Sequence, residues 1–382
     1  MMILNIVQDL DQKSGGVPKV AGVVAGLLQN RGYEAQTKQT RKYSPNLRLD
    51  FGVNIASAAF GVTSIAFTLL RSKFWPQIKP VNPPILIFHG VWTPEFWFLA
   101  LICRVLQFKY LIFVHGMLDQ HSLKHSAKKK NIARKLIVNG FLRRSNFLIA
   151  GSQGEIDAWP RDLLLRNIKI VPNSIASIHP KTLVAPQGNA MVLQALKAKR
   201  VICFMGRTTA KKGLEILIDA FALSVNKFRH ETVLLLLGMK ESEKYENLIL
   251  KKIRCSSARD SIFYTNTITG NHAKYVLSRS SLFALLSDHE GLPIALLEAL
   301  SMGIPSIISD NCNICLDESS GGQVVAGETY ELAKALIYFC DMSDAQLREL
   351  GHKAQSFFQA NFSAETVSVL LASIVEQLED YG

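Results

Sequence analysis

Short apolar runs alternate with longer amphipathic segments along the chain. The runs have the length and composition of buried strands, and they lie at residues 2–7, 85–88, 110–114, 147–150, 169–171, 201–205, 233–237, 261–264, 282–286 and 306–309. Between them, apolar residues recur three and four positions apart, which predicts helices. This alternation predicts an α/β fold with parallel sheets joined by crossover helices.

The same pattern predicts two domains. The chain has 382 residues, which exceeds the size of one ordinary hydrophobic core. Residues 174–188 are rich in Pro, Ser and Ala and carry few periodic apolar positions, as expected of a boundary. We therefore predict one domain at residues 1–178 and a second at residues 179–363.

Two carboxylates are predicted at one strand-to-helix corner. Glu290 follows the apolar run that ends at Leu286, and Pro293 suits the first turn of a helix. Glu298 then lies one to two turns into that helix, and helical side chains lean back toward the N-terminus. Both carboxylates are thus expected to face one crevice at the carboxyl end of a strand, where ligands of parallel sheets bind.

The amides of Gly291 and Leu292 stand at the expected helix start and favour an anion. Hydroxyl-binding carboxylates beside a phosphate-binding helix start predict a sugar nucleotide site. The alternative is an N-terminal carboxylate plus an unrelated exposed glutamate on an amphipathic helix.

A second motif adds positive charge. The strand predicted at residues 201–205 is followed by a loop that carries Arg207 and Lys212, and a helix begins after Gly213. An arginine fork can hold two phosphate oxygens and a lysine adds a point charge. Together they can neutralise a diphosphate as it leaves a sugar. A solvated basic loop is the alternative.

These motifs, in this order, resemble the retaining glycosyltransferases of family 4. The resemblance rests on Gly206-Arg207, Lys212-Gly213, Glu290-Gly291 and Glu298-Ala299-Leu300 with Gly303 and Pro305. Ser14-Gly15-Gly16-Val17 is similar to the family's glycine-rich loop, and Pro172-Asn173-Ser174 to the start of its C-terminal domain. His115-Gly116-Met117-Leu118-Asp119 and His89-Gly90-Val91-Trp92 resemble segments of bacterial surface-polysaccharide members.

The resemblance implies the GT-B fold, in which two Rossmann-like domains with parallel sheets face each other across a cleft. It also implies that the C-terminal helix, at residues 364–382, joins the N-terminal, acceptor-binding domain. The C-terminal domain would bind the nucleotide sugar. The implied reaction is transfer of a sugar, with retention, from a UDP- or GDP-linked donor to a hydroxyl of a glycan or lipid-linked acceptor.

Roles for individual residues follow from the resemblance. Arg207 and Lys212 would hold the diphosphate, and the amides of Gly291 and Leu292 would also contact phosphate. Gly16 would let the N-terminal loop come close to the diphosphate. Glu298 would accept from the ribose hydroxyls and Glu290 would bind hydroxyls of the donor sugar. His115 would line the sugar and acceptor side, or serve as a structural hydrogen-bonding group.

The resemblance implies no cofactor and no metal, because the two basic side chains take the metal's place. Leaving-group phosphate, rather than a protein side chain, would deprotonate the attacking hydroxyl. The segment Phe263–Thr267 lacks the glycine that the family usually has there, so the resemblance does not determine the details of the pocket for the nucleotide base.

The net charge of +12 is unevenly spread. Residues 120–146 carry eight basic side chains and no acid, with Lys128, Lys129, Lys130 and Arg134 among them. Interleaved apolar residues fit an amphipathic helix that lies on an anionic lipid surface. The protein is then expected in the cytoplasm, peripheral on the inner face of the membrane. Nucleic acid and a merely solvated face are the alternatives.

Two further segments bear on localisation. Residues 51–70 carry no charge, and we expect a buried helix of the N-terminal domain there, with an interfacial or spanning helix as alternatives. Six scattered cysteines, and no basic segment before the first apolar run, favour a reducing compartment without a secretory signal. Cys312-Asn313-Ile314-Cys315 has redox or half-zinc spacing but no second pair, so a structural role is expected.

Other functions stay open at this point. A catalytically silent GT-B protein would bind a nucleotide sugar without turnover, and a nucleotide-sugar epimerase would act without an acceptor. A bacterial polysaccharide role, in lipopolysaccharide O-antigen, capsule or exopolysaccharide assembly, follows from analogy around His115 alone.

Overall fold

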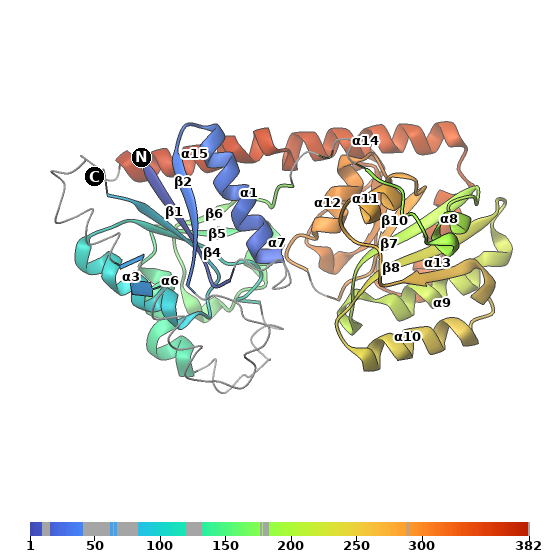
Figure 1. The fold of residues 1–382 in the computed structure, drawn as a ribbon, viewed down its shortest axis with the longest axis horizontal. Coiled ribbons are helices and arrows are strands. Elements are labelled where there is room, and N and C mark those ends of the chain that lie inside the picture. The colour runs from blue at the N-terminus through green and yellow to red at the C-terminus, as the bar shows by residue number, and fades with distance from the viewer. Residues whose placement is uncertain are drawn as a thin grey trace. The chain divides into compact units, whose positions relative to one another are not determined.

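The computed structural model describes residues 1–9, 16–40, 62–63, 65–66, 83–119, 132–175, 178, 183–288 and 290–380. The chain forms two compact units (Figure 1). Unit 1 comprises Met1–Ser174 with Ala364–Gly382, and unit 2 comprises Ile175–Ser363.

Unit 1 is built on a parallel sheet with six strands among the described residues, in the order β2-β1-β3-β4-β5-β6. The strands are β1 (Met2–Val7), β2 (Glu34–Gln39), β3 (Ile85–His89), β4 (Tyr110–Phe113), β5 (Phe147–Ala150) and β6 (Ile168–Ile170). The helical segments are α1 (Gly16–Asn30), α3 (Pro94–Leu106), the π-helical η3 (Arg134–Val138), α6 (Asn139–Arg143), α7 (Gln153–Asp157), η4 (Arg161–Leu163) and α15 (Ala364–Asp380).

One face of this sheet is covered by α3 and by the η3–α6 segment. Every second residue of the central strands enters one apolar cluster with both helical segments. Phe88 of β3 is its centre, because its ring contacts Phe96 of α3 at 5.3 Å and Phe141 of α6 at 5.6 Å. Both helical segments therefore lie on the same side of β3.

The C-terminal helix α15 belongs to unit 1. It packs along α1, and Arg31 beyond α1 donates to Ser368 Oγ at 3.0 Å and to Glu365 Oε1 at 2.6 Å. Lys109 Nζ donates to the carbonyl oxygen of Leu378.

Unit 2 holds a second parallel sheet, in the order β12-β11-β10-β7-β8-β9. Its strands are β7 (Arg200–Thr208), β8 (Thr232–Lys240), β9 (Ile262–Thr265), β10 (Leu282–Leu285), β11 (Ser306–Ser309) and β12 (Gly322–Val325). Its α-helices are α8 (Ala190–Ala195), α9 (Leu214–Ser224), α10 (Glu243–Cys255), α11 (Gly270–Ser278), α12 (Ile294–Ser301), α13 (Thr329–Asp341) and α14 (Asp344–Phe362). Short 3-10 turns lie at η6 (Ala210–Lys212), η7 (Val225–Lys227), η8 (Arg259–Ser261), η9 (Asp310–Cys312) and η10 (Glu318–Ser320).

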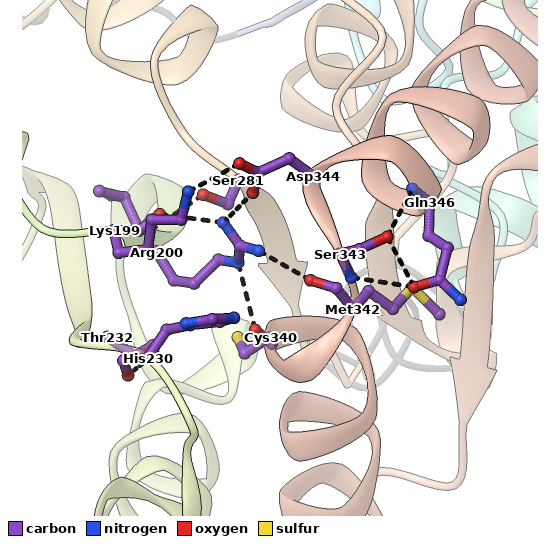
Figure 2. Close-up of polar contacts among 11 residues, drawn as sticks. Lys199, Arg200, His230, Thr232, Ser281, Cys340, Met342, Ser343, Asp344 and Gln346 are labelled. Carbon is purple, nitrogen blue, oxygen red and sulfur yellow. Dashed lines mark hydrogen bonds and ion pairs between the residues drawn. The ribbon is translucent and has the colours of Figure 1, made fainter.

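A buried arginine ties the start of β7 to the junction of α13 and α14 (Figure 2). Arg200 donates to the carbonyl oxygens of Cys340 and Met342 at 3.1 and 2.7 Å. Its guanidinium also pairs with Asp344, which Lys199 contacts as well, each at 2.7 Å. These two cations lower the pKa of Asp344 to about 2.

The predicted α/β class with parallel sheets is confirmed, but some strands differ from the predicted ones. The strands β2 and β12 were missed, because both are edge strands without an apolar run: β2 is polar and β12 is Gly-Gln-Val-Val. Strand β7 runs three residues further than predicted, because it pairs with β8 as far as Thr208 opposite Lys240. Arg207 therefore lies within β7 and not in the loop after it.

The segment at residues 51–70 is described only at 62–63 and 65–66. Those residues are helical, and Val62 and Ile65 are buried in the core of unit 1. Among the described residues, one helical run, Asp344–Glu379, has the length and apolar composition to cross a membrane. Leu350 and Ala354 of α14 and Val367 and Leu371 of α15 are buried within the protein.

Candidate functional site

The carboxyl edge of the sheet in unit 2 brings together a predicted cation and a predicted carboxylate. Lys212, in the turn after β7, forms an ion pair with Glu290, in the loop after β10. Ser287 Oγ donates to the same carboxylate oxygen at 3.0 Å. The side chains of Lys212 and Glu290 are 15% and 19% exposed, so the pair is reachable but largely shielded from water.

The backbone around this pair is held from two directions. Gly213 has φ +61°, and a Cβ there would stand 2.1 Å from the carbonyl oxygen of Leu286. Only glycine lets the turn after β7 approach the end of β10 so closely. The amide of Glu290 donates to the carbonyl oxygen of Asn311 at 3.1 Å, and Asn313 Nδ2 donates to the carbonyl oxygen of Glu290. These two hydrogen bonds fix the loop that carries Glu290.

Arg207 has a different ionic partner. Its guanidinium pairs at 3.1 Å with Glu241, the residue directly after β8, and both side chains are about half exposed. An anion such as a diphosphate would compete with Glu241 for Arg207. Glu241 was missed by sequence reasoning, because nothing in its own segment marks it.

Glu298 lies in α12, as predicted, and pairs at 3.4 Å with Lys274 of α11. Lys274 was also missed. Gly291 and Leu292 lie just before α12, which begins at Ile294 with Pro293 as its N-cap. Leu292 is buried, and Gly291 has open space where a Cβ would stand.

A buried polar network occupies the ends of β7, β8 and β9. Glu246 of α10 accepts from Tyr264 Oη at 2.9 Å and from Asn266 Nδ2 at 2.6 Å. The hydroxyl of Thr208 lies 3.1 Å from Tyr264 Oη, and Gly238 leaves no room for a Cβ beside them. Tyr264 and Asn266 belong to the segment Phe263–Thr267, in which the sequence has no glycine.

In unit 1, His115 follows β4 with a left-handed backbone, φ +53°. Its Nε2 lies 3.0 Å from His89 Nδ1, and His89 Nε2 lies 3.1 Å from Asn5 Oδ1. The oxygen of Asn5 can only accept, so His89 carries its proton on Nε2. In this arrangement His115 Nε2 donates to His89 Nδ1, and His115 Nδ1 is an acceptor.

Both imidazoles are neutral near pH 7. Burial lowers the pKa of His115 to about 4. Burial, with the neighbouring His115 as the second cause, holds the pKa of His89 well below its usual value. A neutral His115 suits hydrogen bonding to a sugar hydroxyl better than charge stabilisation.

The loop of His115 is anchored by a buried carboxylate that sequence reasoning missed. Glu155 of α7 accepts from the amide of Gly116 at 2.6 Å and from the amide of Gly151 at 2.8 Å. It thereby joins the loops after β4 and β5. The Ser152-x-x-Glu155 spacing was the available signal, because Ser152 caps the amide of Glu155 at 3.1 Å.

Other predicted residues are only partly described. Gly16 begins α1, and the rest of its loop lies outside the described residues. Lys128, Lys129 and Lys130 also lie outside them. Arg134 belongs to η3, where its side chain is 12% exposed and pairs with Asp162 at 3.0 Å.

No cluster of three metal-ligating side chains occurs within the part of the chain that the structure describes. All six cysteines are free, with Cys312 buried and Cys315 exposed. The chain contains one Asp-x-Asp, from Asp9 to Asp11, of which Asp11 lies outside the described residues.

Comparison with known proteins finds similarity to glycosyltransferases. Residues 191–356 match the sequence model of the family described as Glycosyl transferases group 1. An uncharacterized glycosyltransferase of Haemophilus influenzae is 22% identical over 309 residues, or 78% of each chain. A putative colanic acid biosynthesis glycosyltransferase of Escherichia coli K12 is 24% identical over 46% of this chain and 45% of its own.

Solved structures show the fold. HepE of Anabaena, in complex with UDP-glucose, aligns with a TM-score of 0.71 at 15% identity, over 99% of this chain and 100% of its own. Sucrose-phosphate synthase of Thermosynechococcus elongatus aligns with a TM-score of 0.69 at 16% identity, over 100% of both chains. The chain therefore has the predicted GT-B fold. Arg207, Lys212, Glu290 and Glu298 lie within the matched segment, whereas Gly16 and His115 lie outside it.

Proposed function

We propose that this protein is a retaining glycosyltransferase of family 4 that takes a sugar from a UDP- or GDP-linked donor. The observation that carries the proposal is the Lys212–Glu290 pair at the carboxyl edge of the sheet in unit 2. A cation and a carboxylate side by side suit the two parts of a sugar nucleotide, its diphosphate and its hydroxyls. The glycosyl transferases group 1 match over this segment supports the same reaction class.

The diphosphate would replace the carboxylates that pair with the basic residues in this structure. Lys212 is paired with Glu290 and Arg207 with Glu241. Once phosphate oxygens take over both cations, Glu290 is released to accept from hydroxyls of the donor sugar. Glu298, oriented by Lys274, would accept from the ribose hydroxyls.

In the transfer step, the bond between the anomeric carbon and the diphosphate oxygen breaks. A bond from the acceptor oxygen to the same face of that carbon forms, and the acceptor proton passes to the departing diphosphate. Lys212 and Arg207 stabilise the charge that grows on the leaving group, which is the role a metal ion has elsewhere. His115 would accept a hydrogen bond at Nδ1 from a sugar or acceptor hydroxyl.

The acceptor would be a hydroxyl of a glycan or a lipid-linked glycan in bacterial polysaccharide assembly. The similarity to the putative colanic acid biosynthesis enzyme supports this context. UDP is the first nucleotide to test, because HepE was solved with UDP-glucose.

Calorimetry with UDP, GDP and ADP tests the proposal. Wild-type protein is expected to bind one nucleotide, and Arg207→Ala or Glu298→Ala to weaken it about ten- to hundredfold, as for other hydrogen bonds to charged groups. Arg229→Ala is the matched control, because Arg229 is an exposed cation of unit 2 paired with Asp341.

A folded protein that binds no nucleotide would overturn the proposal. Where a nucleotide binds, its sugar conjugates are supplied with acceptor extracts, and the anomeric configuration of the product is read by NMR. An inverted product would refute the retaining assignment.

A further inference from the structure

Helix α3 of unit 1 is apolar on both sides. Its inner face is buried in the core, while Phe98, Leu101 and Val105 stand on its outer face at helical spacing. These three side chains are 53%, 53% and 75% exposed. A surface helix ordinarily turns a polar face to water, so this outer stripe is suited to an apolar partner.

A second exposed apolar group lies on the same side of the sheet. Ile132, Leu136 and Ile137, in and just before η3, are 61%, 75% and 48% exposed. The η3–α6 segment and α3 both pack on Phe88, through Phe141 and Phe96 respectively. Unit 1 therefore presents two apolar stripes from neighbouring elements that cover one face (Figure 1).

The C-terminal end of α3 opens into a cation-lined cavity of about 410 Å³. Arg104 from α3, Lys109 before β4 and Arg144 at the end of α6 all line it, together with Tyr110 and Asn146. No carboxylate lines the cavity among the described residues. Lys109 is held by the carbonyl of Leu378, but the described part of the chain provides no ion pair for Arg104 or Arg144.

We propose that this cavity binds the phosphate of an anionic phospholipid headgroup while the α3 and η3 stripes enter the membrane interface. Unpaired guanidinium groups suit a phosphate, which they can hold with two parallel hydrogen bonds. Apolar side chains beside them suit the boundary between headgroups and acyl chains. Arg104 and the α3 stripe lie on the same helix, and a bilayer with anionic lipid suits both the cavity and the stripes.

This surface differs from the one predicted from the sequence. Arg134 pairs with Asp162 and is largely covered, and the three lysines at 128–130 lie outside the described residues. The inference goes beyond sugar transfer and does not depend on it. It does support a cytoplasmic protein that is peripheral on the inner leaflet.

Vesicle co-sedimentation tests the proposal. The full chain is expected to bind vesicles of phosphatidylglycerol and phosphatidylcholine, and to bind phosphatidylcholine alone much more weakly. Arg104→Gln and Arg144→Gln should each weaken binding to the anionic vesicles by roughly fivefold, the usual value of one basic residue near such a surface. Phe98→Gln with Leu101→Gln should weaken it as well, because the apolar contact is lost.

Matched controls come from unit 2. Lys251→Gln with Arg254→Gln removes two exposed charges of α10, and Leu223→Gln removes an exposed leucine of α9. These changes should leave vesicle binding as it is. Nucleotide binding by calorimetry should be the same in every variant, so loss of vesicle binding is separated from failure of the donor site.

Three results would overturn the proposal. One is equal binding of wild-type protein and the arginine variants to anionic vesicles. Another is a protein that does not bind vesicles but binds glycerol phosphate, with that binding unchanged by the apolar substitutions. The ligand would then be a soluble anion. The third is loss of thermal stability in Arg104→Gln and Arg144→Gln without loss of vesicle binding, which would make these residues helix caps only.

Discussion

The ion pair of Lys212 and Glu290 joins residues that are 78 positions apart in the sequence. Gly213 permits the close turn that carries Lys212, and the side-chain amide of Asn313 fixes the loop that carries Glu290. In the proposed reaction, an incoming diphosphate would find a cation that is already placed. Charge preorganised in this way would stabilise the leaving group without reorganisation at the moment of reaction.

Lys212→Ala is expected to lower kcat for transfer by about a hundred- to a thousandfold, as when one preorganised donor is removed from an active site. The adjacent Lys211 is the matched control, because it lies in the same turn but its side chain is exposed. Lys211→Ala should leave the rate within about threefold, as for a solvated surface charge. Equal losses from the two substitutions would assign the effect to general positive charge and contradict the role given to Lys212.

The two histidines of unit 1 make stability depend on pH. Folding lowers the pKa of His115 to about 4 and holds that of His89 well below its usual value of 6.5. The unfolded chain therefore binds protons first, so stability is full above about pH 6.5 and declines as pH falls toward 4. Two buried carboxylates, Asp119 and Glu155, lie around Gly116, the residue after His115.

Thermal melts between pH 7.5 and pH 4.5 should show this decline in the wild-type protein and a flatter profile in His115→Gln. His352→Gln, on α14 of unit 2, is the control and should keep the wild-type profile. A His115→Gln profile as steep as that of the wild type would contradict the assignment.

Much of the candidate site could be predicted, because its residues belong to local motifs. Glu298 was placed correctly in a helix by the Pro293 and Gly303 punctuation, and Lys212 by the glycine that follows it. The partners Glu241 and Lys274 could not be predicted, because their positions depend on which strand ends become neighbours. The link between His89 and His115 likewise arises only when β3 pairs with β4.

A strand or helix could be predicted from the sequence when its own residues form a clear apolar pattern. The buried central strands contain apolar runs, and these runs predict them from the sequence. The edge strand β2, Glu-Ala-Gln-Thr-Lys-Gln, forms because its register with β1 gives it hydrogen bonds, and no pattern of its own predicts it. The extension of β7 has the same origin, since β8 pairs with it to the end.

The start of β7 provides a stability test. Arg200→Met leaves the carbonyl oxygens of Cys340 and Met342 without their donor inside the protein, and it should lower the free energy of unfolding by about 2–4 kcal/mol. Lys199→Met removes the exposed partner of the same Asp344 and should cost less than about 1 kcal/mol. Urea denaturation followed by circular dichroism measures both, and equal losses would show that the ion pair rather than the carbonyl contacts dominates.

The chain as a whole passes between its two units twice, once after Ser174 and once after Ser363. Unit 2 is a single continuous segment, whereas unit 1 takes α15 from the far end of the sequence. The net charge of +12 belongs to the chain as a whole, but the unpaired arginines of the cavity belong to unit 1 alone. Association with an anionic surface is therefore expected to be oriented, and to weaken as salt rises.

The return of α15 has a consequence for the order in which the protein is made. Residues 1–174 are synthesised before unit 2, but the surface of α1 that α15 covers remains exposed until α15 leaves the ribosome. The sequence of unit 2 is complete before α15 is made, so unit 2 can finish folding while unit 1 still lacks α15. During synthesis, the half of the molecule that is translated first is thus the half that is completed last.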